Sequence, residues 1–278
     1  MNEPALRRKS LLYRSKVEYG GWTANHALGC KHGCKYPCYA MALAKRTGRI
    51  ATYEDWLHPR LVENALDLLE RELSMRAQNI DSVHLCFTTD PFMFDREADC
   101  LVGDVVGMTM GIIRRLNAGG IPVTTLTKGY YPDGLIEGVG DLHPDNQYGI
   151  SLVSLSEAFR SKWEPGAAPI RKRIEALRAL SHSGARTWVS IEPYPTPNID
   201  PSSPDIVQLL DSVAFVDKVV FGKWNYNGLA TTFDREHHFY EGIAGQVVQW
   251  CRTNAKTLLI KKGTPLAREP KADFLALD

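Results

Sequence analysis

The sequence predicts an α/β protein built on a parallel sheet, and two observations support this. Short apolar runs rich in β-branched residues alternate with longer amphipathic segments over most of the 278 residues, a pattern typical of βαβ units. Six or seven such units can be counted, which is fewer than the eight of a closed barrel. Right-handed crossovers then allow either an open doubly wound sheet or an incomplete barrel.

The strands are predicted where β-branched and aromatic residues cluster between turn-forming residues. We expect them at 82–88, 122–127, 148–153, 187–191, 218–222 and 257–260. Helices are predicted between them from apolar residues at helical spacing. We expect helices at 101–117, around Leu135, and at 170–180, 206–213 and 240–251. Gly119, Gly120 and Gly184 follow two of these helices, as glycine commonly does at a helix end.

Polar side chains follow several of the predicted strands. Because the carboxyl ends of parallel strands share one edge of a sheet, these residues should meet in a polar pocket there. They are Thr88, Thr89 and Asp90 after one strand, Lys128 after the next, Ser151 and Ser154 on the third, then Glu192, and Lys223, Trp224 and Asn225.

Composition and charge limit the possible partners and compartments. The 33 basic and 32 acidic side chains nearly balance, so nothing favours a polyanion, which normally binds a basic stripe. No apolar run is long enough to cross a membrane, and the N-terminus lacks the apolar core of a signal peptide. We expect a cytoplasmic protein with no membrane partner. The basic residues 1–20 are interpreted as an N-terminal arm, and 21–278 as the main domain.

Three of the six cysteines, Cys30, Cys34 and Cys38, lie in one short loop with the spacing C-x3-C-x3-C. Tightly spaced thiols in a reducing compartment indicate a metal site rather than a disulfide framework. Zinc would need a fourth ligand, for which His32 and His26 are nearby candidates. A [4Fe–4S] cluster held by three cysteines would keep one iron open for a small molecule. The spacing alone leaves iron–sulfur and zinc nearly balanced.

The loop GCKHGCKYPCYA (residues 29–40) resembles the GC-x-HGC-x-YCYA signature of radical SAM proteins in the spore photoproduct lyase-like branch. Further segments similar to this family follow in the same order, so that the resemblance spans about residues 20–265: FTTDPF (87–92), LTK (126–128), ISLVS (150–154), WEPGAAPIRKRIEALRAL (163–180) and SIEPYP (190–195). One departure is that the family pattern is C-x3-C-x2-C, whereas here an additional residue, Tyr36 or Pro37, precedes Cys38.

The resemblance implies a partial (β/α)6 TIM-type barrel with parallel strands. It also implies a [4Fe–4S] cluster on Cys30, Cys34 and Cys38, with S-adenosylmethionine bound to the open iron. Reductive cleavage of that cofactor would start radical chemistry on a substrate. By motif, the resemblance implies these further site residues: Tyr39 beside the adenine, Thr88, Thr89 and Asp90 near the methionine amino group or ribose, and Lys128 and Ser151 at the methionine carboxylate.

Other residues allow a functional and a structural interpretation. Cys86 shares a face with Thr88 if the strand is regular, which makes it a candidate hydrogen-atom donor, although a buried core thiol is favoured. Glu192 could bind substrate or ribose. Arg173 is interpreted as a surface helix charge. Cys100 and Cys251 are predicted to pack on helices, the adjacent histidines 237 and 238 to lie in a solvated loop, and Trp224 and Asn225 to line the substrate pocket.

The leading hypothesis is therefore a radical SAM enzyme whose substrate is a nucleic acid, a peptide or a small molecule. Its expected partner is a cellular electron donor such as a flavodoxin or ferredoxin. The alternative is a barrel stabilised by zinc or by a cluster. Such a protein would bind a ligand or carry electrons without radical chemistry.

Overall fold

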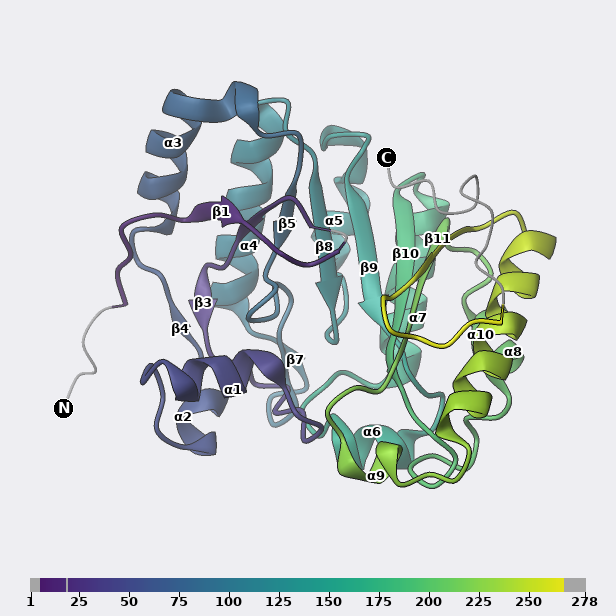
Figure 1. Ribbon diagram of the computed structural model, residues 1–278. Helices are drawn as coiled ribbons and strands as arrows, with labels where there is room; N and C mark the ends of the chain where they lie inside the picture. Colours follow the sequence, from purple (N-terminus) through teal and green to yellow (C-terminus); the bar gives the residue numbers. More distant parts are fainter. Residues whose placement is uncertain (1–5, 19, 268–278) are drawn as a thin grey trace.

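We describe the protein from a computed structural model, which places residues 6–18 and 20–267. An eight-stranded sheet runs through it in the order β1-β2-β5-β8-β9-β10-β11-β12 (Figure 1). The strands are β1 (Leu12–Arg14), β2 (Trp22–Ala24), β5 (Val83–Leu85), β8 (Val123–Thr127), β9 (Gln147–Ser151), β10 (Arg186–Tyr194), β11 (Lys218–Lys223) and β12 (Thr257–Ile260). All neighbouring pairs are parallel except β1 with β2. The predicted partial barrel with parallel strands is confirmed.

Helices cover one face of this sheet because alternate strand residues are apolar. Val189 and Ile191 on β10 belong to the main core with the helices, whereas Trp188 packs with Val220 and Leu259 on the inner face. The larger covering helices are α3 (Ala65–Arg76), α4 (Gly103–Ala118), α7 (Ile170–His182), α8 (Ile206–Ser212) and α10 (Glu236–Thr253), with α5 (Asp133–Glu137) packed on α7.

Shorter elements gather beyond the carboxyl ends of the strands. Figure 1 shows β8 and β9 pointing toward the lower edge, where α1, α2, α6 and α9 lie. These helices are α1 (Tyr39–Arg46), α2 (Tyr53–Leu57), α6 (Glu157–Trp163) and α9 (Gly228–Thr231). Two small antiparallel pairs join β3 (Ala27–Leu28) to β4 (Arg60–Leu61), with α1 and α2 between them in the chain, and β6 (Phe94–Asp95) to β7 (Cys100–Leu101). Short 3-10 turns occupy Ala77–Asn79 and Val139–Asp141. The candidate cofactor loop therefore lies at the expected end of the sheet.

The predicted arm contributes an edge strand and reaches the opposite edge of the sheet. Its strand β1 pairs with β2, and Glu18 in the following connection accepts a hydrogen bond from the backbone of Lys262 at 3.2 Å. Lys261 Nζ lies 3.7 Å from the same carboxylate. These contacts join segments more than two hundred residues apart across the open side of the barrel.

Three local predictions are wrong. The predicted strand 82–88 ends at Leu85, because Cys86 adopts a φ of 71° that breaks the extended backbone. Cys100 lies exposed on β7 rather than packed on a helix, whereas Cys251 is buried on α10 as expected. The two adjacent histidines, His237 and His238, lie in the first turn of α10 rather than in a loop.

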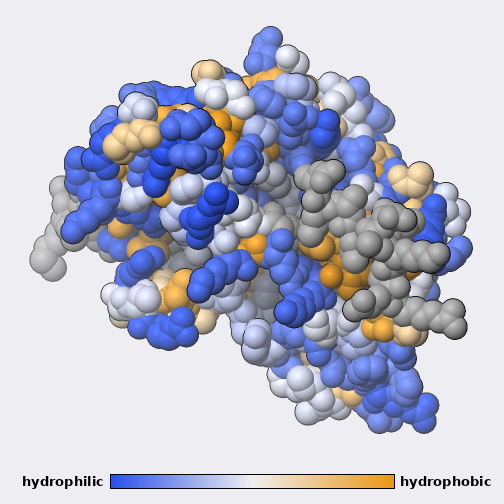
Figure 2. Space-filling view, turned by 45° about the horizontal axis from the view of Figure 1, so that its top comes forward, coloured by the Kyte–Doolittle hydropathy of each residue, from blue (hydrophilic) through white to orange (hydrophobic). Residues whose placement is uncertain are grey.

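None of the helices in the described ranges has the length and apolar character needed to cross a bilayer. On the face shown in Figure 2, hydrophilic residues predominate and hydrophobic residues occur in small groups among them.

Candidate metal and cofactor site

The loop that carries the three cysteines is held by the segment around α2. The backbone N–H of Cys30 donates to the carbonyl of Trp56 at 2.8 Å. Gly29 has a φ of 99°, and a Cβ there would lie only 2.8 Å from that carbonyl, so glycine is required for the close approach. Tyr53 donates its hydroxyl proton to the carbonyl of Gly33 at 2.5 Å. The loop is thus positioned by backbone contacts rather than by its sulfurs.

The three cysteines are partly buried, and their sulfurs do not all lie within 4.8 Å of one another. Burial raises the pKa of Cys30 well above its ordinary value and raises that of Cys34 to about 12, so a cationic centre is needed to stabilise the thiolates. Within the described ranges, only a set on α10 has three or more metal-binding side chains with all ligand atoms inside 4.8 Å. At least one pair of the three cysteine sulfurs is therefore more than 4.8 Å apart, which exceeds the roughly 3.8 Å between tetrahedral zinc thiolates. A cubane, which carries each thiolate on a different iron, fits this spacing better.

Neither histidine considered as a fourth zinc ligand has a ring nitrogen facing open space. Nε2 of His32 accepts the backbone proton of Phe94 at 3.0 Å, and its Nδ1 lies 3.3 Å from Asp90. His26 Nδ1 lies 3.4 Å from the sulfur of Cys86, and Nε2 lies 2.9 Å from the hydroxyl of Thr109. Both rings are fully engaged by protein atoms, so the geometry disfavours a zinc site completed by either.

The buried His26 makes stability sensitive to acid. Burial and the nearby Arg8 lower its pKa to about 4, whereas an unfolded histidine titrates near 6.5. Between these values the unfolded chain binds more protons, so stability is full above about pH 6.5 and falls as the pH drops toward 4. Complete protonation would cost about 3 kcal/mol. We expect the unfolding free energy to decrease from pH 7 to 5, and His26→Asn to flatten this dependence. Equal slopes for the two proteins in denaturant titrations would contradict the assignment.

Asp90 connects the cysteine loop to the ends of two strands. One carboxylate oxygen accepts from the Thr127 hydroxyl at 2.6 Å, and the other accepts from the Lys128 backbone at 2.9 Å and faces His32. Burial would raise the pKa of Asp90, but His32 and these hydrogen bonds outweigh it and lower the pKa. The structure thus places this carboxylate inside the protein, where it positions the loop against β8.

A buried ionic network lies behind the loop, and its central residue, Glu164, was not among the predicted site residues. Its carboxylate accepts from Tyr36 at 2.9 Å and from Arg173 at 3.0 Å, and lies 3.8 Å from Lys128 Nζ. Arg173 is buried and also donates to the carbonyl of Ser151 at 3.0 Å, so its interpretation as a surface charge is wrong. Glu164 and Arg173 both lie in the family-like segment 163–180, which is the signal that could have identified them.

The extra residue in the cysteine loop coincides with a buried aromatic side chain. Tyr36 is 8 % exposed, and its ring lies under Lys128 Nζ at 5.6 Å. Trp224 packs edge-on against it with ring centroids 5.3 Å apart. Trp224 is therefore buried behind the loop, whereas Asn225 is exposed. The longer spacing before Cys38 accommodates this ring between the loop and the sheet.

The other predicted residues surround the same end of the sheet. Ser151 and Ser190 are in register on β9 and β10. Glu192 lies 3.7 Å from Lys261, and burial raises its pKa despite that neighbour. Thr89 donates to the carbonyl of Gly29 at 2.6 Å, the backbone of Thr88 donates to Asn25, and Tyr39 donates to the carbonyl of Phe87.

Cys86 lies among side chains on the helical side of the sheet. Its sulfur contacts His26, whose ring reaches Thr109 on α4, so the thiol points toward the helical layer. The expectation that it shares a face with Thr88 depended on a regular strand, which the positive φ at Cys86 interrupts.

Comparison with known proteins adds to this geometry. No family model matches the chain. A spore photoproduct lyase variant with bound AdoMet and dinucleoside spore photoproduct aligns with a TM-score of 0.62 and 12 % identity, covering 92 % of this chain and 80 % of that one. Another spore photoproduct lyase variant gives 0.64 at 13 % identity with the same coverage. SuiB of Streptococcus suis, bound to S-adenosylmethionine, gives 0.50 at 14 % identity over 73 % of this chain and 44 % of that one.

One curated sequence is also similar, an uncharacterized protein of Acidianus two-tailed virus. It is 23 % identical over 186 residues, which is 64 % of this chain and 57 % of that protein. The chain thus matches little more than half the length of this relative. At these identities the structural comparisons show a shared fold: the chain has the fold of spore photoproduct lyase.

Proposed function

We propose that the protein is a radical SAM enzyme that holds a [4Fe–4S] cluster on Cys30, Cys34 and Cys38. The observation that carries the proposal is the geometry of these three cysteines. Their three sulfurs do not all lie within 4.8 Å of one another, as a single zinc ion would need, and neither His26 nor His32 is free to complete a zinc site. When bound, the reduced cluster supplies the electron that cleaves S-adenosylmethionine to methionine and a 5′-deoxyadenosyl radical. The fold shared with spore photoproduct lyase and SuiB supports this assignment.

The remaining pocket residues suit the polar parts of S-adenosylmethionine. Lys128 lies at the end of β8 with its ammonium close to the cysteine loop, where it can donate a charge-assisted hydrogen bond to the methionine carboxylate. Ser151 lies at the end of the adjacent strand. Tyr39, which directly follows Cys38, presents an exposed ring suited to packing on the adenine. Asp90 and Glu164 act indirectly on the cofactor site, because they hold the cysteine loop and Lys128 in place.

For the substrate and the electron donor we propose classes of molecule rather than individual compounds. The balanced charge favours no nucleic acid in particular, so a small molecule, a peptide or a nucleobase remains the substrate class. Glu192 and Lys261, paired on the inner face at the mouth of the barrel, are the groups best placed to recognise it. A flavodoxin or ferredoxin would supply the electron.

Anaerobic incubation with S-adenosylmethionine and a strong reductant tests the proposal. We expect a brown protein with about four irons per chain that releases 5′-deoxyadenosine and methionine in equal amounts. A colourless protein with one tightly bound zinc would refute the cluster assignment. An intact cluster that yields no 5′-deoxyadenosine would instead favour an electron carrier.

A further inference from the structure

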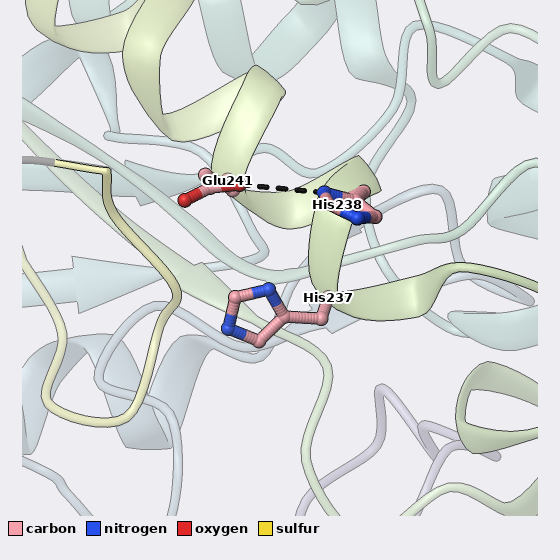
Figure 3. A group of neighbouring side chains, drawn as sticks. All are labelled: His237, His238 and Glu241. Atoms are coloured by element: carbon pink, nitrogen blue, oxygen red, sulfur yellow. Dashed lines mark ion pairs between the residues drawn. The ribbon is translucent and has the colours of Figure 1, made fainter.

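A second group of metal-binding side chains lies on the first turn of α10, well separated in sequence from the cysteine loop. His237 and His238 begin this turn, and Glu241 follows one turn later (Figure 3). Their ligand atoms all lie within 4.8 Å of one another. Helical spacing places Glu241 within reach of both histidines, since it is four residues from one and three from the other. The sequence-based expectation that these histidines lie in a loop is wrong, because both belong to the first turn of α10.

The arrangement is already close to a binding geometry. His238 Nδ1 lies 3.5 Å from a carboxylate oxygen of Glu241, and the two imidazole rings are nearly perpendicular, at 87°, with centroids 6.2 Å apart. Tetrahedral zinc with nitrogen and oxygen ligands keeps those atoms about 3.3–3.5 Å apart. Both histidines are exposed, so their side chains can rotate to close the remaining distance without disturbing the core.

From these contacts we propose that His237, His238 and Glu241 bind a divalent transition metal of the zinc and nickel class. Two imidazoles and one carboxylate are the ligands such ions prefer, whereas calcium and magnesium prefer oxygen ligands alone. Three protein ligands leave at least one coordination position open to water or to an anionic group. The proposal is independent of the cluster and of S-adenosylmethionine.

The position of the turn places the metal at the rim of the barrel mouth. Glu236, the residue before the two histidines, lies 3.3 Å from Lys223 at the carboxyl end of β11. This ion pair fixes the start of α10 against the strand end. The carboxylates of Glu236 and Glu241 also oppose the unfavourable interaction between a cation and the positive end of the helix dipole.

Equilibrium dialysis of the cluster-loaded, full-length protein against zinc chloride tests the site, with zinc and iron counted in the same sample. We expect one zinc per chain in addition to an unchanged iron content, and no comparable retention of magnesium or calcium. His237→Ala/His238→Ala should lose this zinc, and Glu241→Gln should weaken its binding. His58→Ala is the matched control, because His58, which directly follows α2, forms an exposed pair with Glu54 but has no second histidine beside it.

The experiment separates the proposal from the alternatives. Retention of zinc by the double variant, or equal loss from the His58 variant, would overturn it. Zinc that enters only as iron is lost would locate the ion at the cysteine loop and would also overturn it. The substituted histidines are exposed, and an unchanged iron content and thermal midpoint would show that each variant is folded.

Discussion

Cys34→Ala is expected to remove the iron–sulfur cluster and all cleavage of S-adenosylmethionine. Three cysteines are the whole local ligand set, and neither His26 nor His32 is placed to substitute for one. The iron content should fall from about four atoms per chain to nearly none. The brown colour should disappear, and 5′-deoxyadenosine should become undetectable. Iron analysis and product chromatography on anaerobically purified protein measure these effects.

Cys100→Ala provides the matched control for this experiment. Cys100 is an exposed thiol on β7, outside the cysteine loop, so its removal should leave iron content and product formation unchanged. A Cys34 variant that keeps its full iron content would show that the cluster is held elsewhere. A comparable loss of iron in both variants would contradict the assignment of Cys30, Cys34 and Cys38 as the ligand set.

Glu164→Gln is expected to lower the free energy of unfolding by about 3–5 kcal/mol, because it leaves buried positive charge without its partner. Glu164 and Arg173 are almost completely buried, with side chains 3 % and 1 % exposed. Burial would raise the pKa of Glu164, but Arg173 and Lys128 outweigh this and lower it. The carboxylate is therefore charged at neutral pH, and glutamine removes that charge with little change of shape.

Glu175→Gln on α7 is the control for this second prediction. Glu175 pairs with Arg171 at 3.6 Å, but both side chains are largely exposed, and such pairs contribute about 0–1 kcal/mol. Denaturant titration of both variants measures how much each substitution lowers the free energy of unfolding. Similar small losses would show that the buried network is not the stabilising feature inferred here. A double variant that also replaces Arg173 by Met should be less destabilised than the sum of the single changes.

The order of strands and helices and the grouping of the three cysteines could be predicted from the sequence, because both depend on short-range spacing. Three cysteines within one loop must lie near one another whatever the fold. Strand residues that alternate between two packing faces have a period visible over a few positions. Accordingly, both bounds of the observed strands Val123–Thr127 and Thr257–Ile260 lie within one residue of the expected bounds.

Tertiary structure alone decided which polar side chains contact one another. Glu164 meets Tyr36 across 128 positions in the sequence, and no local pattern reveals such a contact. The direction of the Cys86 side chain depends on a single positive φ, which turns the thiol toward the helical layer. A regular strand would have placed it on the same face as Thr88. His237 and His238 converge with Glu241 because that segment is helical rather than a loop. Spacing along the chain thus determined which thiols form the proposed ligand set, whereas long-range packing determined what surrounds and supports them.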